Sequence, residues 1–401
     1  MPANSPSWKF RSRLRRSAFG WRGSRLAITR LTEALAEIRA VRRKDGVRAA
    51  EGAVLLLEKI SPAVRDVDSS SGALGTAVHA AVEELVPVIC AAAVADPVRD
   101  AWLDRLFEAI QEDDPPYIES LGDAWGALCV TVERASRWAD ELLPLVRQVM
   151  AQRRAGRFGW FPCTSLCYSA LFSANRHDEL LSLLAEDAPT IWPFRLWGGR
   201  VFAARGDPDA AIAYMESAGC VQQHPYALAR FAEEVLLDAG RRNEAYEKYA
   251  IEANRGNSYV ATYRAIARKY PEVDSDRILA ELIASTPGEE GKWFAAARTL
   301  KRFDMALTLA RQSPTDPRTL IRAASSEASD RPQFATEAAL LALHWMAQGY
   351  GYEVSGLDVA AAIRIARQAA ARGSLSGAVE DQIATILARS GSAAQWMRQF
   401  A

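Results

Sequence analysis

The sequence predicts an all-α protein, and three features of the 401-residue chain support this fold class. Long stretches place apolar residues three or four positions apart, which is the spacing of one face of a helix. The alternating, Val- and Ile-rich runs that indicate strands are missing. One short helix–turn–helix pattern returns several times between residues 171 and 313.

The repeated pattern is an apolar helix, a tight turn and a second helix that opens on an acidic or amide residue. The turns of its four clear copies fall at Asn175, Gly206, Gly240 and Lys301, which are 31, 34 and 61 residues apart. The longest interval holds two units, because a degenerate copy lies at 269–278. A fixed period of this length is typical of stacked helical repeats.

Each position of the pattern has a physical reason. Glycine and asparagine adopt the left-handed conformation that ends a helix. Three residues after each turn, a side chain is placed near the free N–H groups of the next helix; these are Asp178, Asp209, Asn243 and Asp304. Two positions further on, a small residue lets the helices approach closely, as at Ala211, Ala245 and Ala306. Such a pair cannot bury its apolar faces alone, so the copies are expected to stack into a solenoid.

The period, turns and alanine positions of residues 160–313 resemble tetratricopeptide-type repeats. The glycine and alanine positions carry most of this resemblance, because no copy has all of the family's Trp, Leu-Gly and Tyr positions. The resemblance implies a right-handed α-solenoid of antiparallel helix pairs. It also implies a non-enzymatic scaffold that holds a protein or peptide partner on its concave face. The whole chain further resembles bacterial proteins of unknown function, which adds no chemistry.

Less regular helical pairs are expected on both sides of the repeats. We expect helices at 26–43, 47–60, 72–93, from Asp96 onward, 117–130 and 131–150, and then at 319–328, 333–347, 358–372 and 379–390. Ser61-Pro62 is expected to end the second of them, because a residue before proline disfavours the helical region. The predicted organisation is a basic, aromatic segment (1–25), an N-terminal helical domain (26–152), the repeats (158–313) and C-terminal repeats with a cap (314–401).

The formal net charge is zero, so the molecule as a whole is not a general binder of nucleic acid. Residues 1–32 nevertheless contain eight Lys or Arg and no Asp or Glu, which is a strong local asymmetry. Candidate polyanion-binding residues are Lys9, Arg11, Arg13, Arg15, Arg16, Arg22 and Arg25.

Aromatic residues alternate with these basic residues, and three interpretations remain open. The aromatic rings could pack on the first helices while the arginines reach solvent. They could stack on the bases of a nucleic acid. The segment could also bind an acidic protein or lie at a membrane surface.

Residues 258–270 contain tyrosines and basic residues at helical spacing. Tyr259 and Tyr263 share one face of a helix, and Arg264 and Arg268 follow. We identify these four residues as the candidate partner-binding site for a peptide. The alternative is that the tyrosines only pack in the core.

The sequence indicates neither a cofactor nor a metal site. Cys163 and Cys167 are one helical turn apart, but zinc needs two more ligands and His177 is the only nearby histidine. The adjacent Glu289 and Glu290 are explained by the helix dipole. An enzyme remains an alternative without a residue to support it, since no nucleotide, hydrolase or metalloprotease motif occurs. Five cysteines without a Cys-x-x-Cys pair and no apolar run of 18 residues predict a cytoplasmic protein without a transmembrane span.

Overall fold

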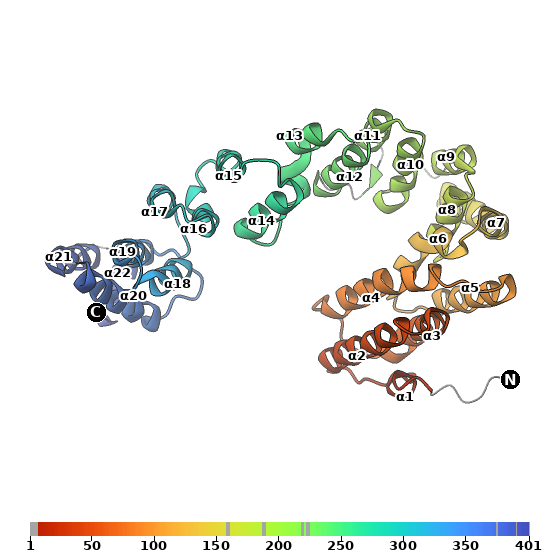
Figure 1. Cartoon of the computed structure of the whole chain (residues 1–401), viewed down its shortest axis with the longest axis horizontal. Helices are drawn as coiled ribbons and strands as arrows, with labels where there is room; N and C mark the ends of the chain where they lie inside the picture. Colours follow the sequence, from red (N-terminus) through yellow and green to blue (C-terminus); the bar gives the residue numbers. More distant parts are fainter. Residues whose placement is uncertain are drawn as a thin grey trace. The chain divides into compact units, whose positions relative to one another are not determined.

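A computed structural model shows that the chain is built from α-helices (Figure 1), which confirms the predicted all-α class. The structure describes residues 7–157, 161–186, 190–217, 220–221, 225–373, 376–389 and 391–400. The chain divides into two compact units, Met1–Gln223 and His224–Ala401. The division falls within residues 158–313, the range predicted to hold the regular repeats. The finer organisation into four segments stays a prediction.

The first unit contains helices of very different lengths. In chain order they are α1 (Phe10–Arg13), α2 (Ser24–Arg42), α3 (Gly46–Val64), α4 (Ala73–Cys90), α5 (Asp96–Gln111), the 3-10 helix η1 (Glu119–Ala124), α6 (Trp125–Cys129), α7 (Val132–Arg154), α8 (Thr164–Ser173), α9 (His177–Glu186), α10 (Trp192–Ala204) and α11 (Pro208–Glu216). A parallel pair of two-residue strands, β1 (Thr190–Ile191) and β2 (Cys220–Val221), joins the chain before α10 to the chain after α11.

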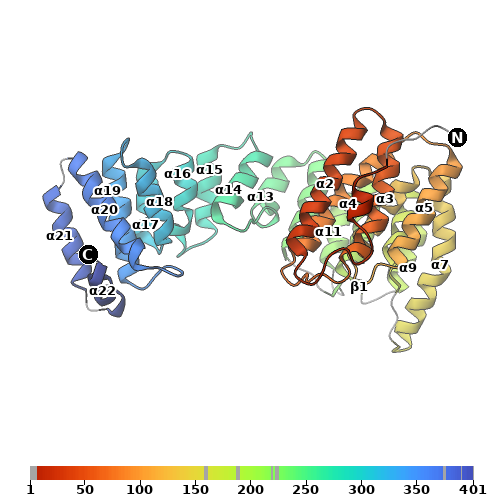
Figure 2. The same ribbon diagram turned by 90° about the horizontal axis from the view of Figure 1, so that it is seen from below.

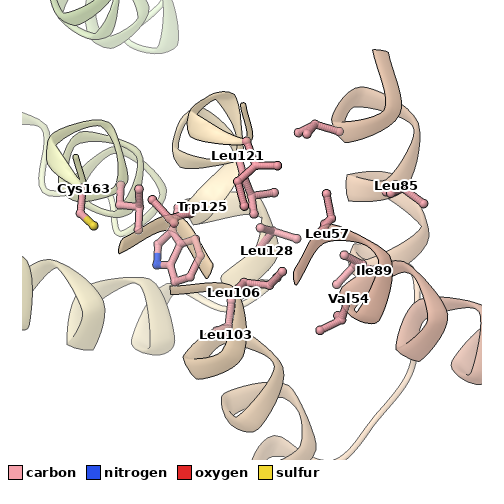
Figure 3. Packing of buried hydrophobic residues seen from close by; sticks show 14 of the residues in the cluster. Val54, Leu57, Leu85, Ile89, Leu103, Leu106, Leu121, Trp125, Leu128 and Cys163 are labelled. Carbon is pink, nitrogen blue, oxygen red and sulfur yellow. The ribbon is translucent and has the colours of Figure 1, made fainter. Parts of the chain in front are cut away.

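The core of the first unit is continuous from its N-terminal segment to α10. Figure 3 shows part of this core. Leu106 and Leu128 lie beside Trp125, and Leu57 lies next to Leu128 on the side away from the tryptophan. The Trp125 ring is fully buried and meets the Trp138 ring edge-on at a centroid distance of 5.0 Å. Aromatic rings in this arrangement stabilise a core beyond the area that they bury.

The second unit has its own core and a more even series of helices. They are α12 (Pro225–Asp238), α13 (Arg242–Ala253), α14 (Tyr259–Lys269), α15 (Ser275–Ala284), η2 (Glu290–Trp293), α16 (Phe294–Thr299), α17 (Phe303–Gln312), α18 (Pro317–Glu327), α19 (Pro332–Ala347), α20 (Gly356–Arg372), α21 (Ser376–Leu387), α22 (Ser392–Met397) and η3 (Arg398–Phe400). Neighbours in the sequence pack against one another, as α18, α19 and α20 do in Figure 2.

The four predicted repeat turns are confirmed and share one geometry. Asn175, Gly206, Gly240 and Lys301 all have positive φ, between 58° and 78°. In each turn the next residue donates its N–H to the carbonyl five positions earlier, as Arg241 does to Leu236 at 2.8 Å and Arg302 to Ala297 at 3.0 Å. This bond satisfies a free carbonyl at the helix end. The same bond recurs after Gly156 and Gly349, outside the predicted copies.

The second helix of each copy also follows the prediction. Asp178, Asp209 and Asp304 lie in the first turn of α9, α11 and α17. The small residues that follow, Ala211, Ala245 and Ala306, are fully buried. The degenerate copy at 269–278 differs, because no residue in it has positive φ.

Two expected element boundaries are wrong. Helix α3 runs through Pro62 to Val64, because Ala63 and Val64 are buried in the core and proline removes only one helical hydrogen bond. The helix expected at 117–130 is broken into η1 and α6. The Asp113 carboxylate binds the N–H groups of Tyr117 and Ile118 there, so the chain turns before α6 begins.

Among the described helices, only α4 is long and apolar enough to cross a membrane. It contains Pro87 and packs against α2, α3 and α6. These contacts are those of a helix within a bundle.

Candidate functional site

A pocket of about 290 Å³ lies in the second unit beside α12 and the C-terminal end of α14. Six residues line it: Arg230, Glu233, Glu234, Leu237, Asp238 and Lys269. All but Lys269 belong to α12, on which Arg230, Glu234 and Asp238 follow one another at intervals of four. Residues at this spacing lie on one side of a helix. We call this set of six residues the α12–α14 groove.

The floor of the α12–α14 groove is a buried carboxylate. Glu233 is fully buried, and the Nζ of Lys269 lies 2.5 Å from its Oε2. Its Oε1 accepts hydrogen bonds from the Nδ2 of Asn254 at 2.6 Å and from the hydroxyl of Tyr270 at 2.7 Å. A buried charge is tolerated only when it is paired and hydrogen-bonded, and these three donors meet that need.

The donors come from different parts of the fold. Lys269 ends α14, Tyr270 follows it, and Asn254 is the C-terminal cap of α13. Glu233 therefore connects α12 to both of the helices that follow it. Burial and the hydrogen bond to Glu233 raise the pKa of Tyr270 far above its ordinary range, so this hydroxyl stays protonated as a donor.

A second layer of contacts holds Tyr270 in place. The Tyr246 ring meets it edge-on at a centroid distance of 5.2 Å, and the guanidinium of Arg242 lies 5.0 Å from its ring centre. The Tyr246 hydroxyl donates to Glu281 of α15. Burial raises the pKa of Tyr246 as well. The groove is thus built on a framework of hydrogen bonds that reaches from α12 to α15.

The rim of the groove is charged and accessible. Arg230, Glu234 and Asp238 are exposed, and in the described part of the chain none of them has an ion-pair partner. The guanidinium of Arg230 lies over the Tyr226 ring at 5.6 Å. Three unpaired charges beside a rigid floor can bind opposite charges on a partner with little reorganisation.

The predicted partner-binding residues lie on the neighbouring helix, α14, and differ from one another in exposure. Tyr263 is 4% exposed and packs in the core. Tyr259 is partly buried; its hydroxyl donates to Glu289, and its ring meets the Trp293 ring at 4.8 Å. Arg264 and Arg268 are exposed and have no ion-pair partner among the described residues. Of this set, only the two arginines are free to contact a partner directly.

The sequence-based search did not identify Glu233, although a signal for it was present. The residue lies between Ala229 and Leu236 on the apolar face of α12, and both of these are buried. An acidic residue on such a face needs a buried partner. Its three partners are 21 to 37 positions away in the chain, so their identity depends on how the helices pack.

The seven basic residues predicted to bind a polyanion are all exposed. Among the described residues, Arg13 alone of the seven has an ion-pair partner, Glu33 at 2.6 Å. The apolar residues between them are divided. Phe10, Leu14 and Phe19 are buried in the core and Trp8 packs against it, as the packing interpretation predicts. Trp21 is 68% exposed.

The other candidates show no arrangement for catalysis or metal binding. Cys163 and Cys167 are buried, and burial raises the pKa of each thiol to about 12. No group of three or more His, Cys, Asp or Glu in the described residues could hold a metal ion. The ion pair with Lys292 lowers the pKa of Glu289, and the Gly288 N–H lowers that of Glu290. Both glutamates are therefore ionised and do not form an acid–base pair.

No protein-family model matches this chain, and no curated protein matches its sequence.

Proposed function

We propose that the protein is a non-enzymatic interaction scaffold that holds a polypeptide partner in the α12–α14 groove. The observation that carries the proposal is the groove itself, in which unpaired charges stand beside a rigid, fully hydrogen-bonded floor. A pre-organised surface loses little entropy when it binds. Arg264 and Arg268 are exposed on α14, the helix that also supplies Lys269 to the groove.

We further propose that the repeats form a tetratricopeptide-like solenoid with the partner on its concave face. Support comes from the shared turn at residues 175, 206, 240 and 301, and from the buried alanines that follow three of these turns. A stack of helix pairs presents one helix of each pair along an extended surface. In this arrangement α12 and α14 would be neighbours on that surface, with Glu233 and Lys269 between them.

The charges of the rim indicate the chemistry of the partner. Glu234 and Asp238 favour a lysine or arginine side chain, and Arg230 one turn earlier favours a carboxylate. The charged residues of the groove are either held in the Glu233 network or solvent-exposed, which suits binding better than proton transfer. The expected partner segment therefore carries a basic residue and an acidic residue within a few positions of each other.

A displayed library of random peptides, selected against the full chain, tests the proposal. Selected peptides should carry a Lys or Arg, and their affinity should fall at least about tenfold for the double variant Glu234→Lys/Asp238→Lys, which corresponds to roughly 1.4 kcal/mol. The control, Asp330→Lys/Asp381→Lys, reverses two exposed carboxylates of the same unit that lie outside the groove. Peptides that bind both double variants as well as they bind the unchanged protein would contradict the proposal.

A further inference from the structure

The backbone between Leu14 and Trp21 is fixed to the first unit at several points. Leu14 and Phe19 are buried. Between them, the N–H of Ser17 donates to the carbonyl of Pro62 at 2.9 Å. Further on, the carbonyl of Trp21 accepts from the N–H of Asp68 at 2.9 Å. The exposed side chains of this segment therefore extend from an ordered backbone.

A tight turn presents Trp21 and Arg22. It is closed by the N–H of Gly23, which donates to the carbonyl of Gly20 at 2.8 Å. A Cβ atom at Gly23 would lie 2.8 Å from that carbonyl oxygen and from the Cβ of Phe19, so the turn closes only with glycine. The buried Phe19 anchors one side of the turn. The indole of Trp21, at a corner of the turn, is 68% exposed.

Residues 7–32, which include this turn, carry basic side chains and no acidic one. The exposed arginines without an ion-pair partner in the described residues are Arg11, Arg15, Arg16, Arg22 and Arg25. The nearby Asp68 directs its carboxylate to the N–H of Ser70 at 3.0 Å instead. Solubility alone requires only a polar surface, and a mixture of acidic and basic side chains provides one. A cluster of like charges repels itself, so an anionic ligand is favoured there.

We propose that this segment, which we call the Trp21 surface (Arg11, Arg15, Arg16, Trp21, Arg22 and Arg25), binds single-stranded nucleic acid. The planar guanidinium groups would bind phosphate oxygens, for which their paired donors are suited. The exposed indole would stack on one base. In a duplex the bases are already stacked on one another, so an unpaired strand is the form whose base faces are open to Trp21.

A membrane surface fits the same charges less well. Insertion at an interface requires a continuous apolar face. The residues that would provide it, Phe10, Leu14 and Phe19, are in the core. Trp21 and Leu26 are the only large apolar side chains strongly exposed within residues 7–32. Stacking on a base requires only one aromatic ring, and the turn provides one.

Fluorescence anisotropy with a labelled oligo-dT of about 12 nucleotides, titrated with the full chain, tests the proposal. If five arginines contact phosphates, the logarithm of affinity should fall with the logarithm of salt with a slope of about −3.5, a loss of roughly 100-fold between 50 and 200 mM. The variant Arg15→Gln/Arg16→Gln/Arg22→Gln/Arg25→Gln should reduce the slope to about −0.7. Trp21→Ala should lower affinity about tenfold and leave the salt slope unchanged.

Two controls separate this surface from general charge and from apolar contact. Arg322→Gln/Arg364→Gln removes two exposed arginines of the second unit and should leave binding unchanged. Leu26→Ala removes the neighbouring apolar side chain and should also leave it unchanged. All variants change exposed side chains, and circular dichroism verifies that each is folded.

Several results would overturn the proposal. The first is that oligo-dT does not bind at 50 mM salt. The second is that the two-arginine control loses as much affinity as the four-arginine variant. The third is that duplex DNA binds as tightly as the single strand and that Trp21→Ala has no effect. A fourth is binding to phosphatidylserine vesicles that both Trp21→Ala and Leu26→Ala abolish while oligo-dT is not bound. Self-association at 50 mM salt that disappears in the four-arginine variant, without binding of oligo-dT, would also refute the proposal and would assign the surface to contact with a second copy of this chain.

Discussion

The Nζ of Lys269 lies 2.5 Å from the Oε2 of Glu233, and the two side chains differ strongly in exposure: 39% for the lysine and 1% for the glutamate. The glutamate carries its charge inside the second unit, while the lysine carries the compensating charge to the wall of the α12–α14 groove. Stability and binding therefore depend on the same pair. Loss of the lysine would leave a buried charge with only two neutral donors.

We expect Lys269→Met to lower the free energy of unfolding of the second unit by about 2–4 kcal/mol, because breaking a buried pair leaves an uncompensated charge. The double variant Glu233→Gln/Lys269→Met should recover more than half of this loss, since a neutral amide needs no counter-charge. Urea unfolding followed by circular dichroism measures both. Lys248→Met, which breaks an exposed pair with Glu244, should cost far less than Lys269→Met, because solvent screens an exposed pair. Equal losses in the single and double variants would show that packing alone is responsible.

The repeat turns can be tested at Gly240 and Lys301, the two repeat-turn residues of the second unit, both of which have positive φ. Gly240→Ala should lower the free energy of unfolding by about 1 kcal/mol, and Lys301→Gly should raise it by about 0.5–1 kcal/mol, since only glycine adopts this conformation without strain. No atom lies within 4 Å of a Cβ built at Gly240, so the effect reports the backbone alone. Gly377→Ala, in the ordinary helical conformation of α21, should be stabilising. A stabilising effect of Gly240→Ala would contradict the assigned geometry.

The contact between α6 and α8 depends on the absence of a side chain at Gly126. Its N–H donates to the Oγ of Ser169 at 2.9 Å, and a Cβ there would collide with the Ser169 carbonyl oxygen and the Ser173 side chain. Gly126→Ala should therefore destabilise the first unit by about 1–3 kcal/mol or more. Gly75→Ala in α4, where the space is open, is the matched control in thermal unfolding. A neutral Gly126→Ala would mean that the two helices pack less closely than described.

The pH dependence of the first unit should show the burial of Asp113. Burial raises the pKa of its carboxyl group above the ordinary value of 3.8. The folded state then holds the proton more tightly than the unfolded state, so this group's contribution to stability falls as pH rises from about 4 through the raised pKa and is constant above it. Asp113→Asn removes this dependence. Urea unfolding at a series of pH values measures the difference in stability between the variant and the unchanged protein. As pH rises through that window, the variant should become more stable relative to the unchanged protein. A relative gain of the variant as pH falls would refute the assignment.

Local features of this protein are determined by the sequence itself. The turns at Gly206 and Gly240 could be predicted because a left-handed residue is a property of one position and its nearest neighbours. The buried Ala211 and Ala245 follow from their fixed distance to those turns. The helix boundaries of the C-terminal part agree with the sequence to within three residues for the same reason, since proline and capping residues act within one helical turn. Pro62 departs from its expected role because burial of the residues after it outweighs one lost hydrogen bond.

The tertiary structure alone decided the candidate sites. The spacing of Tyr259 and Tyr263 places them on one face of a helix, but the packing of α14 decided that this face meets the core and that Arg264 and Arg268 meet solvent. Likewise, the sequence shows aromatic residues alternating with arginines, and only the fold distinguishes the buried Phe19 from the exposed Trp21. Glu233 obtained its partners from α13 and α14, which lie far along the chain. Local propensity extends over a few residues, whereas burial and ion pairing depend on which distant segments meet.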